Sequence, residues 1–293
     1  MRRTFLLVAL LAALVAAGAF AQAFTVSYLD GTVELQTAKS WSAVSIGDKI
    51  ATDATVRVSD SGSLELTRAG AKITILKDGV FSVANLAAGA PSGGSSVGSS
   101  IAQKLQTLVT EKPKASAAGG VRGAQQGAGD VTWVDENDET RAQAQALLDK
   151  KDWKGAAALL QDSINDASSD TDVAEFSYLL GVAYYGAGQT AKAYRTLSKL
   201  SADPAASWYA RYVILKAQVL VDTQNYTDAL GVLTPFISTY PTGEATQVAW
   251  LLSGISQKGL GNKAAAKSAF DSGYQLDATT DTARLIDQQR KAL

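Results

Sequence analysis

The residue types that usually carry enzyme chemistry are scarce in this sequence of 293 residues, which contains no histidine and no cysteine. Without them the chain lacks cysteine nucleophiles, Ser-His-Asp triads, histidine bases and the usual ligands of zinc, copper and iron. A pair of carboxylates hydrolyses glycans when it stands about 5–10 Å apart in a cleft. No spacing in the sequence predicts such a pair. We therefore predict no enzyme activity, no catalytic residue, no metal site and no cofactor.

The densest group of charged side chains is the run Asp135-Glu136-Asn137-Asp138-Glu139. A calcium loop needs glycine at its sixth position and a carboxylate at its twelfth, where Thr140 and Ala146 stand. Acidic residues are favoured at a helix start, where they satisfy free amides and the helix dipole. The glycine-rich segments 89–98 and 119–129 lack the Gly-Lys-Ser/Thr of a phosphate loop. We interpret the run as a helix start and both segments as linker.

The elements that position the polar residues of the second half repeat along the chain. Alanine recurs at intervals of 37, 36 and 37 residues, at Ala156, Ala193, Ala229 and Ala266, and a bulky residue follows four positions after each. Such a period is typical of arrays of helical hairpins. The apolar residues from 138 onward follow a helical period. The predicted helices are 138–150 and 153–166, 172–187 and 190–202, 205–222 and 226–239, 243–259 and 263–276, and a last one at 280–292.

Residues 24–87 instead alternate between apolar and polar, as strands with one buried face do. Turn signals separate the short strands, and Asp30-Gly31 is expected to form a tight hairpin. Trp41 is expected to fill the core of this small domain. The sequence thus predicts a two-domain β plus α fold, a small antiparallel β sandwich or roll followed by an α-helical solenoid over 138–293.

Residues 88–137 have the composition of a flexible linker, rich in glycine, serine and alanine. A short helix is expected near 101–110. An extra strand of the β domain at 121–134 is left open. Trp133 is expected to dock one domain on the other.

Residues 1–23 have the features of a signal peptide. Arg2-Arg3 is followed by the apolar run Phe5–Ala17 and by small residues at Ala19-Phe20-Ala21, with Ala21-Gln22-Ala23 as the alternative cleavage pattern. An uncleaved membrane anchor is the competing interpretation. With cleavage, we expect a periplasmic or secreted protein that has no transmembrane segment and, for want of cysteine, is not a lipoprotein. The net charge of −1 predicts no basic face, so nucleic acid is not expected as a partner.

The second half resembles a tetratricopeptide repeat (TPR) array. The best match runs through Leu180-Gly181, Tyr184, Gly188, Ala193, Leu197 and Pro204. The units have 36–37 residues rather than the usual number of about 34, and Ala217 replaces a glycine in the third first helix. The resemblance implies an array of about four helical hairpins plus a terminal helix that binds a protein or peptide.

The first half resembles the periplasmic FecR-type domain. The matching segments begin at Gly31-Thr-Val-Glu-Leu, at Trp41 and at Ser61-Gly-Ser-Leu-Glu-Leu, and Val121-Arg122-Gly123 resembles a later element of the family. The strands that should follow that element are replaced by the repeats. The resemblance implies docking to a second envelope partner, such as peptidoglycan or an outer-membrane component.

The first helix of each pair lines the concave face of a helical superhelix. The candidate partner-binding residues on these helices are Ser177, Tyr185, Arg211, Lys216 and Gln247. The leading hypothesis is a non-catalytic periplasmic scaffold. Two alternatives stay open: a signal relay of the FecR type, although about four residues precede the apolar run, and a carboxylate-based glycan hydrolase. The oligomeric state is not predicted.

Overall fold

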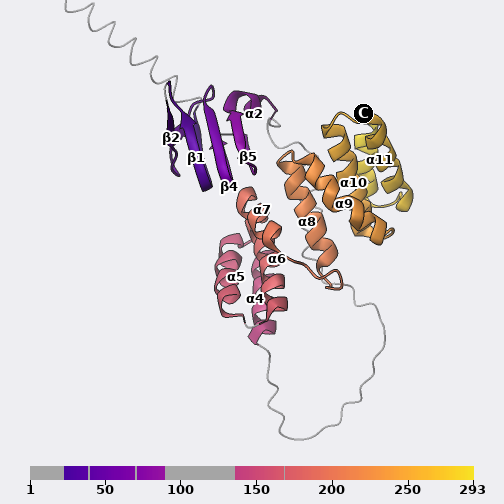
Figure 1. The fold of residues 1–293 in the computed structure, drawn as a ribbon. Coiled ribbons are helices and arrows are strands. Elements are labelled where there is room, and N and C mark those ends of the chain that lie inside the picture. The colour runs from indigo at the N-terminus through magenta and orange to yellow at the C-terminus, as the bar shows by residue number, and fades with distance from the viewer. Residues whose placement is uncertain (1–22, 39, 70, 90–135, 168) are drawn as a thin grey trace, which may run out of the picture. The chain divides into compact units, whose positions relative to one another are not determined.

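The computed structural model describes residues 23–38, 40–69, 71–89, 136–167 and 169–293. The chain divides into two compact units, Met1–Ser96 and Val97–Leu293. In Figure 1 the first unit is the indigo and purple sheet, and the second is the series of magenta to yellow helices. The helix predicted at 101–110, the strand at 121–134, Trp133, nearly all of the signal peptide and most of the linker lie outside the described residues, and the predicted domain boundaries stay predictions.

The first unit is a six-stranded antiparallel sheet built around two long strands, β1 (Phe24–Gln36) and β4 (Thr55–Arg68). The short strands are β2 (Trp41–Ala43), β3 (Lys49–Ile50), β5 (Ala71–Ile75) and β6 (Gly79–Ser82), and helix α2 (Val83–Gly89) follows them. β3 and β5 flank the first half of β1 and the second half of β4, while β2 and β6 flank the other halves. The predicted antiparallel β fold is confirmed, but the last residues assigned to strands form α2.

Irregular pairing in the middle of β1 and β4 separates these two halves. The register shifts directly after Asp30, and a Cβ added to Gly31, which has φ of 70°, would lie 2.6 Å from the Cα of Gly62. Asp30-Gly31 thus forms a β-bulge inside β1, and the predicted hairpin is wrong. Glycine here permits two strands to approach closely instead of reversing the chain. Asp78 supports the bulge, since its carboxylate accepts the amides of Ser61 and Gly62 at 3.2 Å.

Both halves of the sheet contribute to one apolar core, in which Phe24 is the fully buried aromatic residue. Trp41 is partly exposed, and the guanidinium carbon of Arg57 lies 4.4 Å from its ring centroid. The expectation that Trp41 fills the core is wrong because of the register. Trp41 lies opposite Gln36, which is exposed, and side chains on one face of adjacent strands share their direction.

The second unit contains nine described helices joined by short connections. They are α4 (Glu136–Asp149), α5 (Trp153–Asp166), α6 (Asp170–Gly186), α7 (Thr190–Lys199), α8 (Tyr209–Asp222), α9 (Tyr226–Thr239), α10 (Glu244–Gly259), α11 (Lys263–Leu276) and α12 (Asp281–Lys291). Each helix packs against the next. The predicted solenoid of helical hairpins is confirmed, and most predicted ends lie within two residues of the observed ones. The exception is residues 200–208, which are not α-helical although two predicted helices extended into them.

Small residues allow the two helices of a hairpin to approach closely. The four periodic alanines are all fully buried. A Cβ added to Gly181 would lie 2.6 Å from Leu197, and one added to Gly254 would lie 2.3 Å from the ring of Phe270. The glycines that end α6 and α10 have a second role, because the rings of Trp153 and Tyr226, respectively, lie against them. Large side chains thus interlock both within and between repeats.

The turn inside each hairpin uses one residue with positive φ. These residues are Lys151, Gln224, Gly188 and Gly261, with φ of 60°, 60°, 72° and 81°. They are spaced like the periodic alanines, so the left-handed residue is part of the repeat. Only two of the four are glycine, which explains why the turn signal is weaker in the sequence than in the backbone.

The last helix, α12, buries only Thr282, Ala283 and Ile286 and exposes a charged outer surface. A polar outer helix is the usual way in which a repeat array ends. Among the described residues, no helix combines the length and apolar character needed to cross a membrane.

Candidate functional site

The five candidate residues lie on three first helices, Ser177 and Tyr185 on α6, Arg211 and Lys216 on α8, and Gln247 on α10. Gln247 is buried, and the other four are partly buried. Gln247 lines a cavity at another part of the array. Their role in partner binding stays a prediction.

The Tyr185 hydroxyl belongs to a polar cluster that links α6 to α8. It donates to Asp222 Oδ2 at 2.7 Å, and Gln218 Nε2 donates to Asp222 Oδ1 at 2.6 Å. Burial, together with the Asp222 carboxylate, raises the pKa of Tyr185 well above its usual value. The neutral hydroxyl therefore acts as a fixed donor.

Aromatic side chains hold α8 against the preceding hairpin, a cluster that the sequence shows only as a high density of tyrosine and tryptophan. The rings of Tyr178 and Trp208 are stacked with centroids 5.3 Å apart. The Tyr212 hydroxyl donates to the carbonyls of Leu197 and Leu200 at 3.1 and 3.3 Å and so satisfies the end of α7. Lys216 Nζ donates to the same hydroxyl at 3.1 Å. Lys216 thus extends an internal network.

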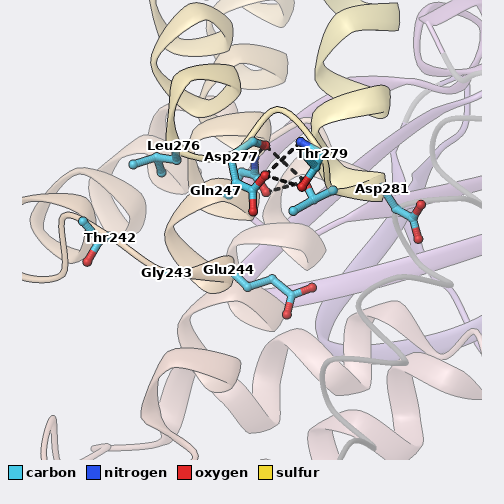
Figure 2. Close-up of a pocket in the computed structure, with 9 residues that line it drawn as sticks. Thr242, Gly243, Glu244, Gln247, Leu276, Asp277, Thr279 and Asp281 are labelled. Atoms are coloured by element: carbon cyan, nitrogen blue, oxygen red, sulfur yellow. Dashed lines mark hydrogen bonds between the residues drawn. The ribbon is translucent and has the colours of Figure 1, made fainter.

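A cavity of about 600 Å³ opens where two connections of the array meet. One connection joins α9 to α10 and the other joins α11 to α12 (Figure 2). The lining residues are Thr242, Gly243, Glu244, Gln247, Leu276, Asp277, Thr279, Thr280 and Asp281. Most of them carry hydrogen-bonding groups, so the cavity suits a polar ligand.

Gln247 fixes the shape of this cavity. Its Nε2 donates to the carbonyls of Gly273 at 3.1 Å and Asp277 at 2.5 Å, and its Oε1 accepts the Thr280 hydroxyl at 2.7 Å. The side chain is 1 % exposed, so these bonds replace water for two carbonyls at the end of α11. Gln247 is thereby a positioning residue for the α11–α12 connection.

The residues that line the cavity are mainly acidic or neutral. Its lining includes the carboxylates of Glu244, Asp277 and Asp281, and no lysine or arginine is among the described lining residues. Hydrogen bonds from the hydroxyl and amide of Thr279, at 2.6 and 2.8 Å, lower the pKa of Asp277. Within the described part of the chain, no three acidic side chains are grouped closely enough to hold a metal ion.

A tetratricopeptide repeat family model matches residues 175–204, which cover most of α6 and all of α7. A comparison with curated proteins found no match. The TPR interpretation is confirmed for this hairpin, and the repeat indicates a protein-interaction scaffold of a generally non-catalytic kind. The resemblance of the first unit to the FecR-type domain stays a prediction.

Proposed function

We propose that this protein is a non-catalytic binding scaffold of the bacterial cell envelope, whose helical repeats hold a protein or peptide. The observation that carries the proposal is the TPR match over residues 175–204, inside a continuous series of helical hairpins. Such an array offers an extended surface on which a partner buries a few anchors within a polar rim. The first helices α6, α8 and α10 carry the proposed contacts.

The test is affinity capture from envelope extract with the chain lacking residues 1–23, followed by titration of each retained protein in purified form. Combined Tyr185→Ala and Arg211→Ala substitutions should weaken binding at least about tenfold. Lys154→Ala and Gln161→Ala, on the exposed side of α5, are the matched control and should leave the affinity unchanged. If no protein binds the purified chain, or both double variants bind like the wild type, the proposal fails.

Export forms a separate part of the proposal. The features of residues 1–23 support cleavage and a periplasmic location. Intact mass measured on protein from the periplasmic fraction should correspond to a chain cut after Ala21 or Ala23. An uncut chain in the membrane fraction would instead support the anchor interpretation.

For the β unit we propose docking to a second envelope partner or to peptidoglycan, supported by its resemblance to the FecR-type domain and by its own apolar core. Sedimentation of the purified chain with isolated peptidoglycan separates these two choices. Retention that survives the Tyr185→Ala and Arg211→Ala substitutions assigns glycan binding outside the repeat surface. If the chain stays in the supernatant, the peptidoglycan arm is excluded.

A further inference from the structure

The joints between neighbouring hairpins of the array differ in how they are packed. The first joint is the contact of α5 with α6, the middle joint that of α7 with α8, and the third joint that of α9 with α10. A Cβ added to Gly186 would lie 2.7 Å from the ring of Trp153, and one added to Gly259 would lie 2.3 Å from the ring of Tyr226. The first and third joints thus each contain an interlock of one ring and one glycine, which resists sliding and turning of the neighbouring hairpins.

The middle joint does not have this interlock at the corresponding described positions. Thr190 stands three residues before its periodic alanine, where Trp153 and Tyr226 stand in the other joints. Thr223, at the end of α8, takes the place of the glycine. Its hydroxyl donates to the carbonyl of Val219 in its own helix at 2.9 Å. Neither threonine therefore supplies the ring or the gap that a ring would fill.

The backbone around the middle joint agrees with this difference. The connection that crosses it, 200–208, is longer than 167–169 and 240–243, which cross the other two joints. Among consecutive helices in the described part of the array, α7 and α8 pack least extensively, and among neighbouring first helices α6 and α8 do. Regions with little buried packing open at a lower cost in free energy than the rest of a structure. The middle joint is thus the weakest of the three.

The two ends of the middle joint are held by different contacts. At the start of α8, Trp208 stacks on Tyr178 with ring centroids 5.3 Å apart, and the Tyr212 hydroxyl binds two carbonyls at the end of α7. These three side chains are buried. At the end of α8, the Tyr185 hydroxyl donates at 2.7 Å to Asp222, which is exposed. Because water can replace an exposed hydrogen bond, this end separates more easily than the aromatic end.

We propose that the array contains a hinge at the middle joint, about which α4–α7 turn as one body relative to α8–α12. The buried aromatic cluster at the start of α8 is the pivot, and the end with Thr190 and Thr223 opens. The hinge goes beyond the proposed scaffold function and does not depend on it. A partner that contacts both α6 and α8 selects one setting of the hinge, because a ligand shifts an ensemble toward the state that it binds best.

Spin labels on pairs of introduced cysteines test the hinge, since the chain itself has no cysteine. Lys154, Gln189 and Thr227 are exposed and lie at the starts of α5, α7 and α9. The pair Gln189→Cys, Thr227→Cys spans the middle joint, and Lys154→Cys, Gln189→Cys spans the first joint as the matched control. Double electron–electron resonance on the purified chain should give a distance distribution about twice as broad for the middle pair. Equal widths would overturn the proposal.

Exchanging the interlock between the joints tests its cause. Thr190→Trp with Thr223→Gly builds a ring and a glycine into the middle joint and should narrow the middle distribution to the width of the control. The opposite exchange, Trp153→Thr with Gly186→Thr, should broaden the control distribution about twofold. Circular dichroism checks that each variant keeps the helix content of the wild type.

An unchanged width in either folded variant contradicts the hinge as proposed. If the rebuilt middle joint loses helix content, the opposite exchange decides alone, and a control pair that stays narrow refutes the role of the interlock. All of these measurements use the purified chain without a partner, so failure of the scaffold proposal would leave their result unaffected.

Discussion

Replacing Gly254 by alanine tests the close packing inside the last hairpin. A Cβ at this position would lie 2.3 Å from the ring of Phe270, which is fully buried. Overpacking of this kind costs about 1–3 kcal/mol, and the severity of the contact places it near the upper limit. Alanine in a helix interior returns about 1 kcal/mol. We expect a net loss of about 2 kcal/mol in the free energy of unfolding, measured by urea titration with circular dichroism.

Gly231→Ala is the matched control, because Gly231 lies inside α9 and a Cβ there would meet nothing within 4 Å. This variant should gain about 0.5–1 kcal/mol. Replacing the ring with a smaller side chain, by Phe270→Leu, should partly relieve the overpacking of the Gly254→Ala variant. The double variant should therefore lose less stability than the sum of the two single losses. A Gly254→Ala protein as stable as the Gly231→Ala protein would refute the close approach of α10 and α11.

Three further predictions concern the bulge, the buried hydroxyl and the cavity floor. Gly62→Ala would place a Cβ 2.7 Å from the carbonyl oxygen of Ser59 and should lower the stability of the β unit by about 3 kcal/mol. Limited proteolysis should therefore cut the β unit faster and leave the repeats resistant. Equal resistance of both units would contradict this. Because the folded pKa of Tyr185 is raised, its stabilising effect is complete below its ordinary pKa of 10.0 and is lost as the pH rises above it. Tyr185→Phe should therefore flatten the loss of stability in alkaline urea titrations, and an unchanged alkaline slope would exclude this role. Gln247→Leu should cost about 2–3 kcal/mol by thermal unfolding, because the buried carbonyl of Gly273 and the partly buried carbonyl of Asp277 lose their donor. A neutral effect would mean that water replaces the amide.

The helical repeats could be predicted because the same physical requirement recurs at each hairpin. Two helices approach most closely at one point, and only a small residue fits there, so Ala156, Ala193, Ala229 and Ala266 mark the register. The hairpin turns are harder to predict from the sequence. Their backbone requires positive φ, but a lysine and a glutamine adopt it at two of four sites, so composition alone underestimates the pattern.

The errors in the β unit come from pairing between distant residues. Asp30-Gly31 has the local chemistry of a hairpin, and nothing within β1 shows that Gly62 will lie against it. Trp41 has the size of a core residue, but its direction depends on the strand that it pairs with. Both properties are set by tertiary register, which a single strand does not contain.

The cavity could not be predicted for a related reason. Its lining joins the start of α10 to the α11–α12 connection, and each stretch alone is an ordinary polar loop. Glu244 and Asp281 also have a local explanation, since acidic residues are favoured at helix starts. From the sequence, only its place on a first helix makes Gln247 a candidate, and its burial depends on the connection that follows α11.

That dependence makes α12 part of the site as well as part of the fold. Thr280, the N-cap of α12, accepts the amide of Ala283 and donates to Gln247, so the start of the helix and the floor of the cavity share one hydroxyl.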